Sequence, residues 1–299
     1  MQKITVIGSI NMDIVLRVPH IPAPGETILA QGVQTFGGGK GANQAAAIAK
    51  LGGDVTMIGR VGNDDHGRTL RTQLQANGVN TCGIETSDGV PTGTAYINVS
   101  DAGENNIVVN PGANGHVTPD MLARHTHLLG DAAYCLIQLE TPIETLYACA
   151  NLCKERDTRL IINPAPAAPL DFGKLQGAWM IVPNESELNL LIPGVGDIIS
   201  KAKALREKGF PHVLVTLGAE GCLLVDGEGA RTYPAYTALP VKDTTAAGDC
   251  FVGALAFGLS KGLGLSQAIH LAVRAAGISV SRAGAQASLP TWAEVEAVL

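Results

Sequence analysis

The stretch WMIVPNESELNLLIPGVGDIISKAKALREKGFPHVLVTLG, residues 179–218, decides the fold class. It holds two short runs, 179–184 and 212–218, that are apolar at nearly every position, as in strands buried on both faces of a parallel sheet. Between them, the apolar residues of 197–209 recur three and four positions apart, and the segment ends in glycine, which is typical of a helix. A helix between two buried strands predicts a strand–helix–strand unit.

The same alternation extends along the chain. Further apolar runs are ITVIG, VTMIGRVG, AYCLIQLE and RLIINPAP, and further helical stretches are GANQAAAIAKLGG and TPIETLYACANLCKERD. This pattern predicts an α/β fold in one domain spanning residues 1–299, a doubly wound and mostly parallel sheet with helices on both faces. Ligands of such sheets bind beyond the carboxyl ends of the strands, so we expect the chemistry there.

Two segments depart from the alternation. Residues 13–36 and 93–110 alternate apolar and polar side chains around turn-forming residues, with no helix between the strands. They predict antiparallel hairpins, inserted at about 14–36 and 93–110, that form a small β-lid over a substrate cleft or are shared with a second copy of the chain. A surface extension without function is the alternative.

Composition limits the classes of function. The 299 residues are 46% hydrophobic and 16% charged, and the net charge of -6 argues against a nucleic-acid partner. No apolar run is long enough for a membrane span and the N-terminal residues do not resemble an export signal, so we expect a cytoplasmic protein. Six scattered cysteines predict reduced, structural thiols; Cys149 and Cys153 share a helical face but lack a second pair at zinc spacing.

The heptad DTTAAGD, residues 243–249, leads directly into an apolar helical stretch. Small residues leave the main-chain amides of a first helical turn uncovered, and such amides favour an anion. Ala246, Ala247 and Gly248 would form this anion hole, and Asp249 beside them would take the proton of a hydroxyl that attacks phosphorus. Ordinary helix capping by the aspartate and threonines of the heptad is the alternative.

Two glycine-containing stretches add polar groups. In FGGGKGANQA, three glycines let the backbone approach a ligand before Lys40, and the following helix presents Asn43. In GSINMD, Asn11 and Asp13 are two residues apart and would point the same way on a strand, where they could hold neighbouring hydroxyls of a polyol. A tight connection and local caps are the respective alternatives. Neither stretch is a Walker motif, and the absence of GxGxxG argues against a dehydrogenase.

The sequence resembles the ribokinase-like (PfkB) carbohydrate kinases over essentially its whole length. The motifs that carry the resemblance occur in the family's order: GSINMD, GGGKGANQA, QLETP, NPAPA, PNESE, VTLGAEG, DTTAAGDCF and GAQASLP. Departures are Cys250, where Thr or Ala is usual, Thr245 at a variable position, and an extra glycine at Gly37. None of them removes a proposed catalytic group.

The resemblance implies ATP-dependent phosphorylation of the primary 5-hydroxyl of D-ribose, with Asp249 as general base. A kinase for deoxyribose, a ketose or a nucleoside remains an alternative, as does a sugar-sensing relative without turnover. The resemblance also implies a homodimer through the β-lid. The implied sugar-binding residues are Asn11, Asp13, Gly38, Gly39, Lys40, Asn43, Glu140 and Asp249.

Nucleotide and cation sites are also implied by the resemblance. Residues similar to the family's ATP-binding positions are Asn184, Glu187, Thr216, Gly218, Gly221 and Gly248, with Glu187 helping to organise hydrated Mg²⁺. Read alone, PNESE is equally a helix N-terminus with an Asn cap. A monovalent cation, usually K⁺, would be held mostly by backbone carbonyls at Asp243, Thr245, Ser279, Arg282, Gly284 and Ser288.

Overall fold

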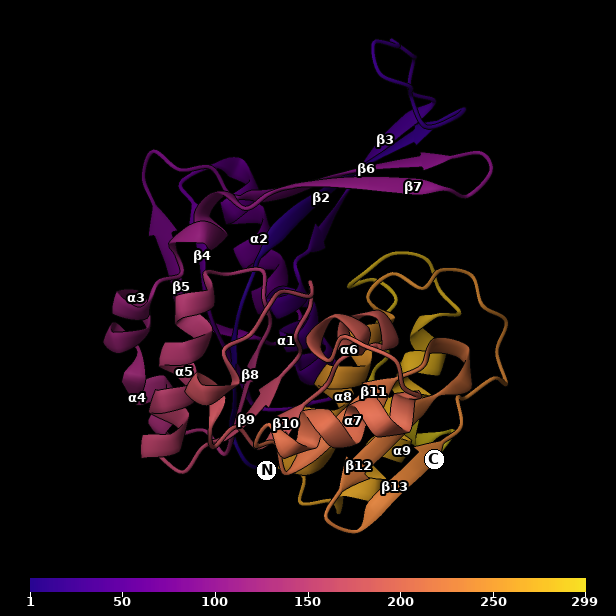
Figure 1. Cartoon of the computed structure of the whole chain (residues 1–299). Coiled ribbons are helices and arrows are strands. Elements are labelled where there is room, and N and C mark those ends of the chain that lie inside the picture. The colour runs from indigo at the N-terminus through magenta and orange to yellow at the C-terminus, as the bar shows by residue number, and fades with distance from the viewer.

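Apolar side chains along the central strands alternate between two cores. In β1 (Ile4–Ile7), Ile4 and Val6 pack in one buried cluster and Ile7 in another. Successive side chains of a strand point to opposite faces, so an apolar run of this kind is satisfied only where helices cover both faces of the sheet. The computed structural model describes all 299 residues and shows this arrangement (Figure 1).

The large sheet has nine strands in the order β13-β12-β11-β10-β9-β8-β1-β4-β5. Strands β5 to β11 in this order pair in parallel, and β12 and β13 add an antiparallel edge. Besides β1, the strands are β4 (Val55–Gly62), β5 (Asn80–Ser87), β8 (Tyr134–Ile137), β9 (Arg159–Ile162), β10 (Met180–Ile181), β11 (His212–Thr216), β12 (Cys222–Asp226) and β13 (Gly229–Tyr233).

Helices cover each face of this sheet. One core, with 43 buried residues, is completed by α1 (Lys40–Lys50), α2 (Asp65–Ala76), α8 (Ala247–Ser260), α9 (Leu265–Ser279) and α10 (Trp292–Glu296). The other core lies under α3 (Pro119–Arg124), α4 (Thr126–Gly130), α5 (Ile143–Glu155), α6 (Glu185–Leu191) and α7 (Ile198–Glu207). The predicted doubly wound sheet is therefore confirmed. None of the helices has the length and apolar character that crossing a membrane requires.

A second sheet of four strands projects from the carboxyl end of β1, along the top of Figure 1. Its order is β3 (Gly32–Gly38), β2 (Asn11–Val18), β6 (Gly93–Ser100) and β7 (Asn105–Asn110). The two predicted hairpin regions supply it, and each contributes an antiparallel pair. In addition, β2 and β6 pair in parallel at the centre, which joins the two pairs into one sheet.

Five of the six thiols are buried, and only Cys82 is exposed. The shared helical face of Cys149 and Cys153 meets Cys135 of β8, and the sulfur atoms of Cys135 and Cys149 lie 3.6 Å apart. Burial raises the pKa of the Cys222 and Cys250 thiols to about 12, which keeps them protonated and unreactive.

Candidate active site

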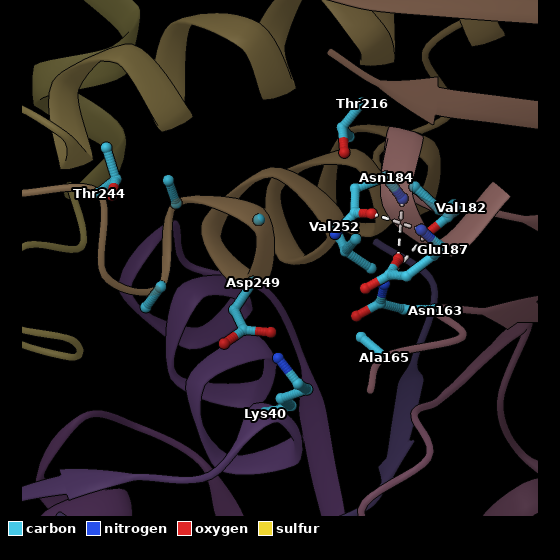
Figure 2. Close-up of a pocket in the computed structure, with 13 residues that line it drawn as sticks. Lys40, Asn163, Ala165, Val182, Asn184, Glu187, Thr216, Thr244, Asp249 and Val252 are labelled. Atoms are coloured by element: carbon cyan, nitrogen blue, oxygen red, sulfur yellow. Dashed lines mark hydrogen bonds between the residues drawn. The ribbon is translucent and has the colours of Figure 1, made fainter. Parts of the chain in front are cut away.

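A pocket opens at the carboxyl edge of the large sheet (Figure 2). The carboxyl ends of three neighbouring strands, β9, β10 and β11, contribute Asn163, Asn184 and Thr216 to its wall. The first turns of two helices contribute Lys40 from α1 and Asp249 from α8. This is the position that the alternation of strands and helices predicts for a ligand site.

Helix α8 begins in a tight turn at the mouth of this pocket. Ala246, the residue before the helix, has φ 58, a left-handed conformation that is uncommon for a residue with a side chain. The amide of Ala247 donates to the carbonyl of Thr244 at 3.2 Å and closes the turn. The amides of Ala246, Gly248 and Asp249 have no hydrogen-bond partner. The free donors at the helix N-terminus therefore include Asp249, which the sequence did not indicate, and not Ala247.

The space in front of these amides is open. A Cβ atom added to Gly248 would meet no atom within 4 Å, and Gly248 lines the pocket. Unpaired amides at the positive end of a helix dipole have the geometry and charge that suit a phosphate group.

Asp249 lies in the first turn of α8 with only 7% of its surface exposed. Asn43 Nδ2 donates to its Oδ2 at 3.0 Å, and Gln44 Nε2 donates to its Oδ1 at 3.1 Å. Burial raises the pKa of Asp249 above its ordinary value, while the positive charge of Lys40 and these two hydrogen bonds oppose the rise. The carboxylate is thus held by two donors and retains acceptor capacity for a third.

The ammonium group of Lys40 points toward Asp249 in Figure 2. Burial disfavours its charged form, but the carboxylates of Asp249, Glu140, Glu187 and Asp13 together raise the pKa of Lys40. The backbone amide of Lys40 also donates to Glu140 Oε2 at 3.1 Å. One cation is therefore surrounded by acids from four separate elements.

Glycines bring the start of α1 against the first strand. Gly39, which precedes α1, has φ 88, and a Cβ there would lie 2.8 Å from both the amide nitrogen of Asn11 and the carbonyl oxygen of Ser9. A Cβ on Gly38 would overlap the carboxylate of Asp13 at 2.1 Å. The glycine run thus lets the backbone pack closely against Ser9, Asn11 and the carboxylate of Asp13.

Asn11 and Asp13 lie on the same side of β2, as the spacing predicted. Asn114, after β7, donates to Asn11 Oδ1 at 2.6 Å and so turns the NH₂ group of Asn11 away from itself. Burial, then the charges of Glu140 and Asp249, raise the pKa of Asp13 to about 7, with Lys40 acting in the opposite direction. Asn11 and Glu140 also line a second hollow that reaches Val109 of the small sheet.

Asn184 and Glu187 form a reciprocal helix cap and line the pocket as well (Figure 2). The amide of Glu187 donates to Asn184 Oδ1 and the amide of Asn184 donates to Glu187 Oε2, each at 2.8 Å. The helix cap that PNESE predicts as an alternative is therefore present. Both residues of the cap also line the pocket, where they are placed to meet a ligand. Thr216 lines the pocket, whereas Gly218 and Gly221, which lie in and after the short turn 218–220, do not.

The residues implied for a monovalent cation fall into three groups. Asp243 accepts from the amides of Thr245 at 2.9 Å and Gly284 at 2.8 Å, which ties the loop before α8 to the loop after α9. The hydroxyls of Ser279 and Ser288 bond each other at 2.8 Å, and Arg282 pairs with Glu294. The Asp243 carboxylate therefore joins two of the loops that carry the implied carbonyl ligands.

Four polar residues of the site were not singled out from the sequence: Ser9, Gln44, Asn114 and Asn163. Ser9 lies in GSINMD and Gln44 in GGGKGANQA, but in both motifs the sugar-binding role was assigned to neighbouring residues. Asn163 likewise opens the quoted motif NPAPA, whereas no local pattern marks Asn114. Asn163 Oδ1 accepts from Gln44 at 3.0 Å, 119 positions away.

Comparison with known proteins agrees with this geometry. The pattern of the pfkB family carbohydrate kinases matches residues 1–292. A ribokinase of Lactococcus lactis is 40% identical, covering 100% of this chain and 97% of the relative. A deoxyribokinase of Salmonella typhimurium is 33% identical, covering 96% and 95%.

Among solved structures, an Arabidopsis thaliana ribokinase complexed with ribose and ATP superposes with a TM-score of 0.93 at 30% identity, covering 100% of this chain and 99% of that one. Family pattern, relatives and fold therefore agree over the full length. The chain belongs to the pfkB family of carbohydrate kinases.

Proposed function

We propose that this protein is an ATP-dependent kinase that converts D-ribose to D-ribose 5-phosphate. The observation that carries the proposal is the position of Asp249, a buried carboxylate between free amides on one side and sugar-type ligands on the other. Asn11, Asp13, Gly38, Gly39, Lys40, Asn43 and Glu140 would hold the sugar. The ribokinase names of the most similar relatives support ribose as the acceptor.

In this mechanism the 5-hydroxyl of the sugar gives its proton to Asp249 as its oxygen attacks the terminal phosphorus of ATP, and ADP leaves. The free amides of Ala246, Gly248 and Asp249 would stabilise the charge on the transferred group. Phosphoryl transfer requires mainly positioning and charge neutralisation, so no covalent intermediate is needed.

On the nucleotide side, Asn184, Thr216 and Gly248, which line the pocket, would contact ATP. Gly218 and Gly221, on the turn after Thr216, would lie along the nucleotide. Glu187, which lines the same pocket, would help to organise hydrated Mg²⁺, a cation that supplies charge neutralisation for the phosphates. The loops joined by Asp243 would hold K⁺ through carbonyls, and hydrogen bonds from Thr245 and Gly284 outweigh burial and lower the pKa of Asp243. An ionised Asp243 suits a neighbouring cation.

The small sheet is proposed as a lid and as the contact of a homodimer. Its strands expose large apolar side chains: Val33, Tyr96, Ile107, Val108 and Val109. A group of exposed apolar residues on one small sheet is typical of a surface that another protein covers. The cytoplasmic location expected from the sequence also stays a proposal.

A kinase for 2-deoxyribose is the second candidate, because a deoxyribokinase matches over nearly the whole chain. ADP release should be measured with ATP and Mg²⁺, with and without K⁺, over ribose, deoxyribose, fructose and nucleosides. Ribose is expected to give the highest kcat/KM, since a site that hydrogen-bonds a hydroxyl discriminates against a substrate lacking it. A higher value for deoxyribose would select the second candidate, and no turnover of any sugar would favour a sensor.

A further inference from the structure

Buried side-chain amides connect the proposed base to the sheet. Gln44 on α1 has no exposed surface, and its Nε2 donates both to Asp249 Oδ1 at 3.1 Å and to Asn163 Oδ1 at 3.0 Å. Gln138, directly after β8, donates from Nε2 to Gln44 Oε1 at 2.6 Å. Both N–H groups and the oxygen of the Gln44 amide are therefore engaged.

The orientation of each side-chain amide in this network follows from the acceptors at its two ends, the Asp249 carboxylate and the carbonyl of Val182. An ionised Asp249 only accepts hydrogen bonds, so Gln44 must present its NH₂ group to it. At another end, Asn163 Nδ2 donates to the carbonyl of Val182 at 3.0 Å, which leaves Asn163 Oδ1 facing Gln44. Gln138 then satisfies the one acceptor that remains on Gln44. One orientation of each amide meets all these bonds.

The sheet is the rigid support for the network. Gln138 and Asn163 follow the carboxyl ends of β8 and β9, which are adjacent strands. Gly8, at the end of the next strand β1, leaves room for Gln138, because a Cβ there would lie 2.1 Å from Gln138 Oε1. The hydrogen bonds of Gln44 therefore fix the Asp249 carboxylate relative to the ends of three neighbouring strands, β9, β8 and β1.

We propose that Gln44, supported by Gln138 and Asn163, is a positioning residue that holds the Asp249 carboxylate in one orientation for proton transfer from the sugar. This inference rests on the proposed kinase function. Without Gln44, Asp249 would keep only the hydrogen bond from Asn43 and could rotate about its side-chain torsions. Substrate binding would change little, because Gln44 does not line either hollow of the site.

The charged groups around Asp249 give the network a second effect. Lys40 at the start of α1 favours the ionised carboxylate, whereas Glu140 after β8, Asp13 on β2 and Glu187 on α6 oppose it. Asn43 and Gln44 supply the neutral donors that also favour ionisation. Loss of the Gln44 donor should therefore raise the pKa of Asp249 and move the acid limb of the kcat profile to higher pH.

The test compares Gln44→Met, which keeps length but has no donor, with Gln44→Glu, which keeps shape but offers an acceptor. A hydrogen bond to a charged group contributes about 1.5–3 kcal/mol, so Gln44→Met should lower kcat by at least ~10-fold. KM for ribose and ATP should stay within ~2-fold, and Gln44→Glu should be the more damaged. Gln138→Met, which leaves the Gln44 donor in place but unsupported, should give a smaller fall in kcat and a smaller shift of the acid limb in the same direction.

The control is Gln75→Met on α2, which removes a hydrogen bond to Thr81 Oγ1 of 2.9 Å away from the site. Wild-type kcat and an unmoved pH profile in Gln44→Met would overturn the inference, as would a loss of ribose affinity equal to the loss of kcat. Should Gln44→Met fail to fold, the same kcat-against-KM comparison is made on Gln138→Met, where wild-type kcat also overturns it. A wild-type protein inactive on every sugar would instead refute the proposed function.

Discussion

The side-chain amide of Asn43 lies 3.0 Å from the carboxylate of Asp249, although 206 positions separate the two residues. Asn43 belongs to the first turns of α1 and Asp249 to the first turn of α8, so two helix N-termini meet at this bond. The hydrogen bond therefore holds a proposed sugar-binding residue and the proposed base together.

Asp249→Asn should lower kcat at least ~100-fold, as is expected for loss of a general base. Ribose should still bind, because Asn keeps the size of the side chain and Asn11, Asp13 and Glu140 are unchanged. Calorimetric titration with ribose and a coupled ADP assay measure the two effects separately. Full activity in this variant would refute the proposed mechanism.

Asp13 should make the ligand-free protein less stable as pH rises. Its pKa is about 7 in the fold against an ordinary 3.8, so the folded state binds more protons between these values. The stabilising effect of a neutral Asp13 is complete at low pH and is lost as pH rises toward and through 7. Asp13→Asn should therefore raise Tm at pH 8 more than at pH 5, by an amount equivalent to about 2–3 kcal/mol.

The control for this comparison is Asp54→Asn on an exposed loop, which should shift Tm equally at both pH values. An Asp13→Asn variant whose Tm change is the same at pH 5 and pH 8 would contradict the raised pKa.

Gly39→Ala should destabilise the protein by more than ~2 kcal/mol and weaken ribose binding, because φ 88 is unfavourable for Ala and the new Cβ would meet backbone at 2.8 Å. Gly52 is a matched control: its φ is 87, yet a Cβ there meets nothing within 4 Å. Gly52→Ala should cost only about 1 kcal/mol and leave ribose affinity intact. Equal effects of the two changes would show that the packing against Ser9 and Asn11 is unimportant.

A thiol reagent should modify only Cys82 in the folded protein and all six cysteines after denaturation. The other five are buried, so their modification requires opening of the structure. Cys82→Ser should abolish the fast reaction, which absorbance or intact mass can follow. A second fast-reacting thiol would show that one of the cores opens readily.

Val108→Asp should dissociate the proposed homodimer, since this exposed side chain lies on β7 of the small sheet. Sedimentation velocity should show a fall from dimer to monomer mass. Val195→Asp, in the loop before α7 where the side chain is fully exposed, should leave the mass unchanged. A wild-type monomer at assay concentration would remove this proposal and leave the kinase proposal untouched.

The sequence predicted the large sheet well because its strands are marked by local composition. The apolar runs around Ile4, Tyr134 and Val213 are each buried on both faces, so every residue carries the signal. It failed to identify the edge strands β5 and β13, whose exposed polar positions weaken the signal. It also missed β12, although the buried apolar run of that strand carries the same local signal. Strand pairing between distant segments leaves no pattern in the local sequence. The parallel pairing of β2 with β6 was therefore not predicted.

Within the site, the sequence motifs identified residues proposed to bind a ligand. They did not identify the residues that hold those side chains in place. Lys40 and Asn43 follow from the glycine run before a helix, whereas Gln44, the next residue, points into a buried network. Its partner Gln138 lies 94 positions away, and only the fold brings the two together. The free amide of Asp249 depends on the turn at Ala246, a backbone detail that residue types do not determine.

Strand β2 carries Asn11 and Asp13 at its start and is also the inner strand that binds both β3 and β6. A rotation of the four-stranded sheet as one body would therefore displace these two side chains relative to Asp249, which belongs to the other sheet's helices. The sheet would then act as half of the sugar cradle and not as a cover over a finished one. In such an enzyme, the same movement of the small sheet would bind the sugar and bring it to Asp249.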